Sequence, residues 1–188
     1  KQMQKTKVNF DTVYEFETLY NAYRASRRGK RWKNTVAKVE MNALEAIAVL
    51  QEELSTGTYR PGGYREFYVF EPKKRLIMSL PFKDRIVQWA IYRQLFPLYE
   101  KTFIFDSYAC RKGKGTHKAA DRLQYWLRQT ERKPERYYYL KMDISKYFYR
   151  VDHDILLKIL ARRIKDQRLL NPVSYTHHRA HETLMNLV

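Results

Sequence analysis

A carboxylate that directly follows an apolar segment is the first candidate for chemistry in this sequence. Residues 137–142 predict a strand, because they are rich in the aromatic side chains that strands favour, and Asp143 comes next. A carboxylate at a strand end suits Mg²⁺, a hard cation that takes oxygen ligands. Phosphoryl transfer by two metal ions about 3.5–4 Å apart needs several such carboxylates. An isolated aspartate at a strand end more often makes a turn or a salt bridge, so Asp143 alone does not define a site.

Two other groups of residues have the composition of a ligand site but not the spacing. The loop at residues 111–116 reads Arg-Lys-Gly-Lys-Gly-Thr, but a Walker A loop needs Ser or Thr directly after Gly-Lys, and Gly115 intervenes. Three of the five histidines lie within residues 177–181, without the His-Glu-x-x-His order of a zinc helix. We therefore expect neither an ATP-binding loop nor a metal site at these positions.

The charge of the chain indicates a polyanionic partner. The 188 residues include 37 Lys and Arg against 20 Asp and Glu, a formal net charge of +17, and 15% of the residues are aromatic. Basic side chains bind phosphates while aromatic faces stack on bases, so nucleic acid is the expected partner, although a basic surface over an aromatic core has the same composition. The longest aliphatic run, residues 46–50, is far shorter than the roughly 20 residues of a membrane span. Cys110 is the only cysteine, which excludes an internal disulfide and suits a cytoplasmic protein without membrane contact.

Hydrophobic periodicity predicts an α+β fold. The pattern does not alternate regularly between strand and helix, which argues against a parallel α/β sheet. A basic turn at residues 72–74 joins two strands into a hairpin, Thr116 is the expected cap of the fourth helix, and Asp152 or Asp154 caps the last one. We expect the last helix to turn Ile155, Leu156, Ile159, Leu160 and Ile164 inward. The expected helices are residues 11–26, 35–55, 84–100, 116–129 and 154–166, and the expected strands are 65–71, 75–80 and 137–142.

Four blocks in a fixed order give the sequence a family resemblance. The segment Leu-Lys-Met-Asp-Ile-Ser-Lys-Tyr-Phe-Tyr-Arg-Val-Asp-His resembles motif A of reverse transcriptases. Three upstream blocks are similar to the preceding motifs of that family, at residues 64–79, 81–88 and 106–117. The resemblance covers roughly residues 59–170. It is greatest to bacterial enzymes related to group II intron, diversity-generating-retroelement and retron reverse transcriptases.

The resemblance implies a role for several side chains. Asp143, helped by the backbone carbonyl of Ile144, would bind both catalytic Mg²⁺ ions. Phe148 would lie under the sugar of the incoming nucleotide and exclude a 2′-hydroxyl. Basic residues of the hairpin would bind the triphosphate, and a basic loop would lie near the template and primer. These are Lys73, Lys74 and Arg75 in the hairpin, and Arg111, Lys112, Gly113 and Lys114 in the loop. The implied partners are an RNA template, a DNA primer or product, and deoxynucleoside triphosphates.

The family also has a second acidic motif, which ends in Asp-Asp, and the sequence contains none after Asp143. We therefore expect the fingers and part of the palm of a right-hand polymerase, truncated before that motif and the thumb, and unable to polymerise as given. The expected divisions are residues 1–80 for the N-terminal helices and fingers hairpin, 81–149 for the first part of the palm, and 150–170 for the following helix. Residues 171–188 resemble translated sequencing-adapter DNA, and we expect them to be extraneous.

Two alternatives remain open from the sequence. One is a non-catalytic RNA-binding or maturase-like module of a retroelement, which a complete reading frame without Asp-Asp would favour. The other is a basic α+β phosphotransferase or nuclease with an unrelated magnesium site. A second group of carboxylates near Asp143 that departs from the polymerase order would identify it.

Overall fold

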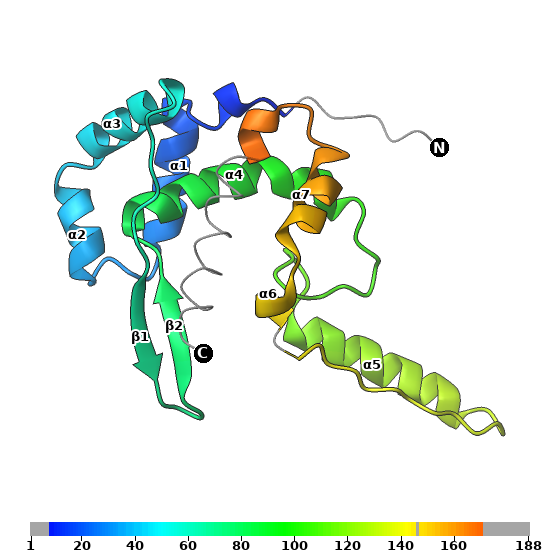
Figure 1. Cartoon of the computed structure of the whole chain (residues 1–188). Coiled ribbons are helices and arrows are strands. Elements are labelled where there is room, and N and C mark those ends of the chain that lie inside the picture. The colour runs from blue at the N-terminus through cyan, green and yellow to red at the C-terminus, as the bar shows by residue number, and fades with distance from the viewer. Residues whose placement is uncertain (1–7, 146, 171–188) are drawn as a thin grey trace. The chain divides into compact units, whose positions relative to one another are not determined.

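The structure, a computed structural model, describes residues 8–145 and 147–170, and it confirms a fold of helices with a small antiparallel sheet. Two compact units are present: one contains the described residues up to Phe96 and those from Tyr149 onward, and the other runs from Pro97 to Phe148. The elements in Figure 1 are η1 (Phe10–Thr12), α1 (Phe16–Arg27), α2 (Asn34–Met41), α3 (Ala43–Ser55), β1 (Arg65–Val69), β2 (Arg75–Ser79), α4 (Phe82–Glu100), α5 (Thr116–Glu131), α6 (Tyr147–Arg150), α7 (His153–Ala161) and η2 (Gln167–Leu169).

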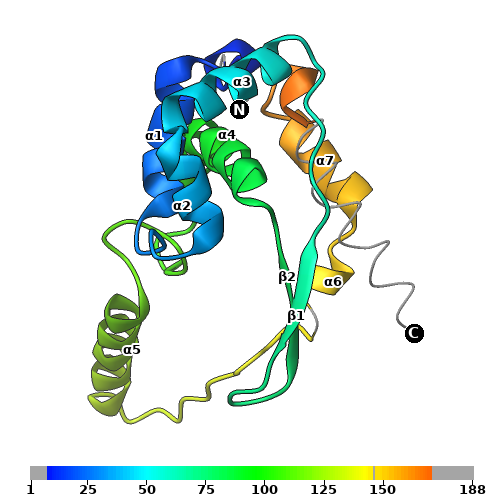
Figure 2. The same ribbon diagram turned by 90° about the vertical axis from the view of Figure 1, so that its left-hand side faces the viewer.

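The hydrophobic core lies in the first unit. Helices α1 and α3 pack side by side, as Figure 2 shows, and α4 adds the apolar face of its first half. Leu19, Ile47, Val87 and Ile164 are buried in one cluster, so the segment after α7 closes the same core that the N-terminal helices begin. Each such side chain contributes about 1.5–3 kcal/mol by leaving water. This core is the support from which the β1–β2 hairpin extends.

The expected single helix over residues 35–55 is two helices. Asn42 ends α2 and precedes α3 with φ −127° and ψ 44°, outside the helical region. The apolar spacing hides this break, because Val36 on α2 and Ile47 on α3 both reach the core. Periodicity reports which residues face inward, and here it did not report the local change in backbone direction.

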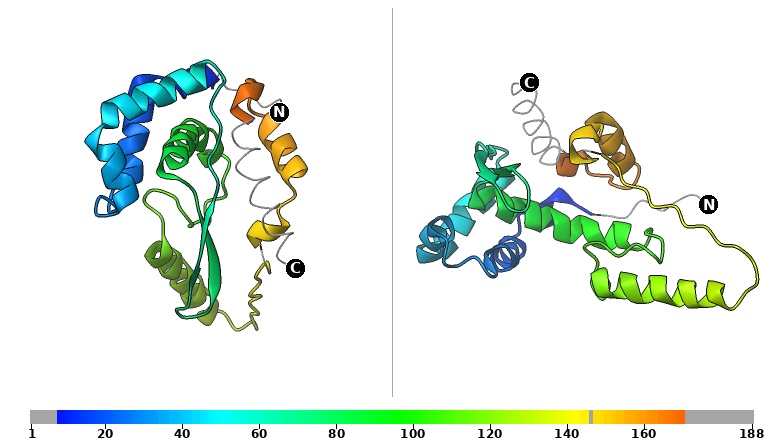
Figure 3. Two further views of the ribbon diagram at one scale, coloured as in Figure 1. Left: turned by 60° about the vertical axis from the view of Figure 1, so that its left-hand side comes forward. Right: turned by 90° about the horizontal axis from the view of Figure 1, so that it is seen from below.

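The expected hairpin is confirmed. Strand β1 pairs antiparallel with β2, with Arg65 opposite Ser79 and Val69 opposite Arg75. Figure 3 shows the pair as a twisted two-stranded ribbon. All of β1 is exposed, and β2 is at most half-buried, so the alternating side chains of these strands do not produce a buried face. The hairpin therefore presents its side chains to solvent on both faces.

Two expectations about helix ends in the middle of the chain are corrected. We expected Pro97 to kink the fourth helix or end it early, but α4 includes Pro97 and continues to Glu100, so the early end is wrong and the kink stays a prediction. A proline in a helix removes only the hydrogen bond to the carbonyl four residues before it, so the helix can continue past Pro97. Thr116 is the first residue of α5 rather than its cap. The capping position belongs to Gly115, which has no side chain that could accept a hydrogen bond from the first turn.

The last helix is shorter than expected, and its cap is the expected one. Helix α7 ends at Ala161, and the Asp152 carboxylate accepts a hydrogen bond from the backbone N–H of Ile155 at 2.9 Å. Ile164 is buried as expected, but Ile155 and Ile159 are exposed. Leu160 packs against the core as expected, together with Leu157 and Ala161, which were not expected there. The expected inward face was therefore rotated relative to the true one.

The strand expected over residues 137–142 does not form. These residues have no regular secondary structure, and Tyr138, Tyr139 and Met142 are each 80% exposed or more. A strand exists only where a neighbour accepts its backbone hydrogen bonds. Among the described residues only β1 and β2 pair as strands. Aromatic composition alone therefore misled the prediction. No helix within the described ranges is long and apolar enough to cross a membrane.

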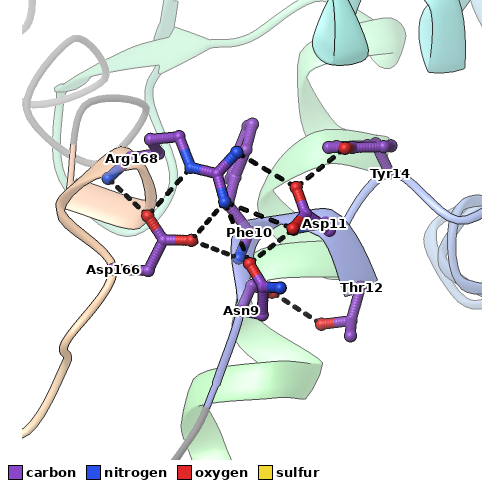
Figure 4. A network of polar contacts seen from close by, with 7 residues as sticks. All are labelled: Asn9, Phe10, Asp11, Thr12, Tyr14, Asp166 and Arg168. Atoms are coloured by element: carbon purple, nitrogen blue, oxygen red, sulfur yellow. Dashed lines mark hydrogen bonds and ion pairs between the residues drawn. The ribbon is translucent and has the colours of Figure 1, made fainter.

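A polar network joins the two ends of the first unit (Figure 4). The Asp166 carboxylate accepts a hydrogen bond from the backbone N–H of Phe10 at 2.9 Å, and Arg168 pairs with it at 2.8 Å. Arg168 also pairs with Asp11 at 3.0 Å, and Asp11 accepts a hydrogen bond from the Tyr14 hydroxyl at 2.8 Å. These contacts hold η2 against η1. Hydrogen bonds from the Arg168 guanidinium, helped by backbone N–H groups, lower the pKa of Asp166 from 3.8 to about 2.

The lowered pKa of Asp166 makes the stability of this unit sensitive to acid. Because the folded carboxyl has the lower pKa, its contribution is present above pH 4 and is lost as the pH falls from about 4 to about 2. We expect the free energy of unfolding in urea to be about 1–2 kcal/mol lower at about pH 2 than above pH 4 because of Asp166 alone. Asp166→Asn should remove that part of the pH dependence, whereas Asp154→Asn, on the exposed surface of α7, should retain it. Equal acid sensitivity in Asp166→Asn and the wild type would contradict this account.

Candidate functional site

Asp143 lies in an exposed, extended segment, followed by Ile144, which is 65% exposed. A carboxylate oxygen and a backbone carbonyl are the kinds of ligand that Mg²⁺ takes, so the donors fit this ion in kind. They do not fit in number, because the described residues contain no group of three or more His, Cys, Asp or Glu side chains able to hold a metal. A metal site at Asp143 would therefore need further ligands beyond those that the described residues group together.

Phe148 belongs to the short helix α6, which begins four residues after Asp143. Its side chain lies outside what the structure describes. The expected contact between the Phe148 ring and a nucleotide sugar therefore stays a prediction from the family resemblance.

The basic residues expected to bind a triphosphate lie at the tip of the hairpin. Lys73, Lys74 and Arg75 are all exposed, and Arg75 begins β2. The Lys74 ammonium lies 4.5 Å from the centre of the Tyr68 ring, a cation–π contact that holds it against β1. No acidic partner is found for the three cations among the described residues. Their charge is thus available to an anion.

The Arg111 side chain makes its contacts inside the second unit. Its guanidinium pairs with Glu100 at 2.8 Å and donates hydrogen bonds of 2.9 Å to the backbone carbonyls of Ile104 and Ser107. The Arg111 side chain is only 10% exposed. Arg111 therefore stabilises the conformation of the loop between α4 and α5. Any contact between Arg111 and a template would be made in addition to these internal contacts.

The other predicted site residues of this loop differ in whether they contact the rest of the unit. Lys112 and Gly113 are exposed. The Lys114 ammonium donates a hydrogen bond to the Phe105 carbonyl at 2.7 Å and lies 3.7 Å from the centre of the Phe105 ring. Gly113 has φ +72°, a conformation that a residue with a Cβ rarely adopts. A glycine is therefore required here for the turn that exposes Lys112.

Cation–π contacts hold much of the second unit together. Arg122 lies 4.8 Å from the Trp126 ring and 5.2 Å from the Phe105 ring, and it pairs with Asp106 at 3.0 Å. None of the described side chains in this unit is buried. Half-exposed aromatic rings beside cations have the composition of a stacking surface for unpaired bases.

Asp84 is an important residue that the sequence analysis missed. It is 1% exposed, in the first turn of α4. Its carboxylate accepts hydrogen bonds from the Tyr59 hydroxyl at 2.7 Å and from the backbone N–H of Gly62 at 2.9 Å. Burial, together with the Asp84 carboxylate, raises the pKa of Tyr59. A Cβ on Gly62 would lie 2.8 Å from Cγ of Pro81, so the chain can approach α4 this closely only with glycine. Asp84 thus fixes the segment that leads into β1.

The expected site residues fall in both units. The hairpin cations Lys73, Lys74 and Arg75 belong to the first unit, whereas Asp143, Phe148 and residues 111–114 belong to the second. Asp143 and Ile144 are neighbours in the chain within the second unit.

The sequence matches a known family. The pattern of the family described as reverse transcriptase (RNA-dependent DNA polymerase) matches residues 70–185. The chain belongs to the reverse transcriptase family, as the ordered blocks indicated. This membership sets aside the alternative of an unrelated phosphotransferase or nuclease. The match runs into residues 171–185, which lie outside the described residues, and the expectation that residues 171–188 are extraneous stays a prediction.

Relatives in curated collections include intron-encoded proteins. The chain is 31% identical over 126 residues to "Protein YkfC" of Escherichia coli K12, with 66% of this chain and 33% of that protein covered. It is 26% identical over 152 residues to "Nuclear intron maturase 2, mitochondrial" of Arabidopsis thaliana (72% and 20% covered). It is also 26% identical over 128 residues to "Group II intron-encoded protein LtrA" of Lactococcus lactis (66% and 20% covered). The chain thus spans between a fifth and a third of these relatives, and the group II intron resemblance is confirmed.

Proposed function

We propose that this chain provides the fingers and the beginning of the palm of an RNA-directed DNA polymerase. The observation that carries the proposal is the family match over residues 70–185, which includes the hairpin cations and Asp143. The surplus of positive charge supports a nucleic-acid partner, because each bound phosphate is neutralised by a Lys or Arg. On this proposal residues 1–80 contain the fingers hairpin, residues 81–149 begin the palm, and residues 150–170 form the next helix.

The reaction is nucleotidyl transfer. The 3′-hydroxyl of a DNA primer attacks the α-phosphorus of a deoxynucleoside triphosphate that is paired with the RNA template, a phosphodiester bond forms, and pyrophosphate leaves. Bound Mg²⁺ ions would lower the pKa of the attacking hydroxyl and neutralise the charge on the phosphates. Asp143 and the Ile144 carbonyl would be ligands of those ions, and the remaining ligands come from outside the described residues.

Charged side chains of this chain position the substrates. The unpaired cations Lys73, Lys74 and Arg75 bind the triphosphate, with Arg75 suited to two parallel hydrogen bonds to phosphate oxygens. Lys112, exposed at the Gly113 turn, is the loop cation best placed for a template phosphate. Arg111 and Lys114 shape that loop through their contacts with Glu100 and Phe105, and they add positive charge beside it.

Nucleotide selection by Phe148 tests this proposal. In protein expressed from the complete reading frame, Phe148→Val should raise the incorporation of ribonucleotides relative to deoxynucleotides by about 10–200-fold, because removing the ring leaves space for a 2′-hydroxyl. The measurement is the ratio of kcat/KM for a deoxynucleotide and its ribonucleotide in primer extension. Tyr147→Val, one residue earlier in α6, is the matched control and should leave the ratio within about twofold. An unchanged ratio in Phe148→Val would remove Phe148 from the nucleotide site.

A second candidate is a maturase-like RNA-binding module without polymerase activity. The relative of 26% identity named an intron maturase favours it, and the net charge of +17 suits it equally well. Primer extension separates the two candidates. RNA binding without any DNA synthesis by protein from the complete reading frame would select the maturase-like module.

A further inference from the structure

A groove of about 550 Å³ lies at the base of the hairpin, within the first unit. Helix α2, strand β1 and the start of α4 contribute to it, and its volume is in the range of small-ligand sites. Its walls combine apolar surface, including Phe67 and Phe82, with the cationic residues Lys33, Arg65 and Arg85. The sequence analysis gave none of these three cations a role, although Arg65 and Arg85 lie within the blocks at residues 64–79 and 81–88. The hairpin tip that was expected to hold the triphosphate is a separate part of β1–β2.

The cations of the groove have no acidic partner among the described residues. Lys33 and Arg65 are exposed, and Nε of Arg85 is buried without a hydrogen-bond acceptor. The neighbouring carboxylate, Asp84, already accepts from the Tyr59 hydroxyl and the Gly62 N–H. The groove is therefore lined by cationic side chains whose charge is not balanced by an acidic partner among the described residues.

Helix α2 adds to the positive potential of the groove. Lys33 is its N-terminal capping residue and Thr35 lies in its first turn, and both line the groove. No side chain caps this end, and the first turn contains no acidic residue. The free N–H groups of a helix N-terminus carry a partial positive charge that favours an anion.

We propose that this groove binds a phosphate of a single-stranded RNA, with the adjoining ribose or base against the Phe67 ring. The cations supply the phosphate contacts, while Phe67, 43% exposed, supplies an aromatic face. The proposal rests on the proposed function, because it takes nucleic acid as the partner of the chain. A free nucleotide has the same phosphate chemistry, and the continuous strand is favoured because the groove is open and lined by elements that also support the hairpin.

The test measures binding of a fluorescent 12-nucleotide RNA to the 188-residue chain as a function of KCl concentration. Lys33→Gln/Arg65→Gln/Arg85→Gln should weaken binding at least tenfold and reduce the slope of log K against log salt by about 0.7, the value for one phosphate of a single strand. The control Lys38→Gln/Lys158→Gln/Arg162→Gln removes three exposed charges that do not line the groove, and it should weaken binding less than threefold. Lys33→Gln/Arg65→Gln changes only exposed groove cations, so it should retain the fold and still weaken binding at least fivefold.

The outcomes separate the groove from the wider function. If the groove variants and the control variant weakened RNA binding equally, the proposal that the groove binds RNA would be overturned. The proposal that the chain binds nucleic acid would still stand. Absence of RNA binding by the wild-type chain would contradict the proposed function and the groove together. A deoxynucleoside triphosphate tested in the same way identifies the source of the phosphate. If the groove variants lost affinity for the deoxynucleoside triphosphate but not for RNA, the assignment of the groove to single-stranded RNA would be overturned.

Discussion

Replacing Asp143 with asparagine is expected to reduce RNA-templated DNA synthesis by about 1,000-fold or more, in protein expressed from the complete reading frame. Asparagine retains the size of the side chain and one oxygen, but it removes the negative charge that a divalent ion requires. A loss of about 4 kcal/mol in the stabilisation of the transition state accounts for that factor. RNA binding should change less than twofold, because Asp143 is an exposed anion that contributes no phosphate contact.

Asp152 provides a matched control for Asp143. It lies nine residues further along, and it caps α7 through the Ile155 N–H. Asparagine caps helices as well as aspartate does, so Asp152→Asn should retain both folding and synthesis. Primer extension on both variants, with RNA binding measured on the same preparations, gives the comparison. Synthesis by Asp143→Asn at a tenth or more of the wild-type rate would exclude Asp143 as a metal ligand.

Asp84→Ala is expected to destabilise the first unit by about 3–5 kcal/mol. The substitution leaves the Tyr59 hydroxyl and the Gly62 N–H without their acceptor in a buried place, and each hydrogen bond to a carboxylate is worth about 1.5–3 kcal/mol. The segment before β1 should loosen at the same time. Because the hairpin begins there, its orientation to the helices depends on this one carboxylate.

Urea unfolding followed by circular dichroism measures the effect of Asp84→Ala. Asp84→Asn gives an intermediate case, since its amide oxygen still accepts one hydrogen bond while its NH₂ group faces a second donor. The expected order of stability is wild type, then Asp84→Asn, then Asp84→Ala. Asp121→Ala, an exposed position on α5, should stay within about 0.5 kcal/mol of the wild type. A similarly small loss in Asp84→Ala would contradict the role assigned to Asp84.

Local signals in the sequence predicted the local features well. The hairpin was correct because its turn carries Pro72 and two lysines between alternating segments. The sequence offered Asp152 or Asp154 as the cap of the last helix, and Asp152, one residue before α7 begins at His153, is the one that caps it. The break at Asn42 could not be found in the same way, since the residues on both sides keep the helical spacing of a continuous buried face.

Features that depend on distant partners were predicted poorly. Residues 137–142 have the composition of a strand, yet a strand needs a neighbour, and composition does not report one. Arg111 contacts Glu100 and two backbone carbonyls of the loop between α4 and α5. No short sequence motif predicts the conformation of that loop, so these contacts could not be predicted. Asp84 stands within the block at residues 81–88, but only burial distinguishes it from the charged residues on either side.

The expected site residues came from family resemblance rather than from geometry. Asp143, Phe148 and the hairpin cations were chosen by their likeness to the family motifs; the family match covers their positions, and their roles stay predictions. Arg65 and Arg85 of the groove lie within the blocks at residues 64–79 and 81–88, but no motif assigned a role to them, and Lys33 lies outside all four blocks. They became visible only when folding brought α2, β1 and α4 together around a common space.

DNA synthesis on an RNA template tests the central claim most directly. Protein expressed from the complete reading frame is incubated with a labelled DNA primer on an RNA template, the four deoxynucleoside triphosphates and Mg²⁺. We predict full-length complementary DNA that disappears when the RNA or the Mg²⁺ is omitted. Protein that binds the primer–template but never extends the primer would contradict the claim that this chain belongs to a polymerase.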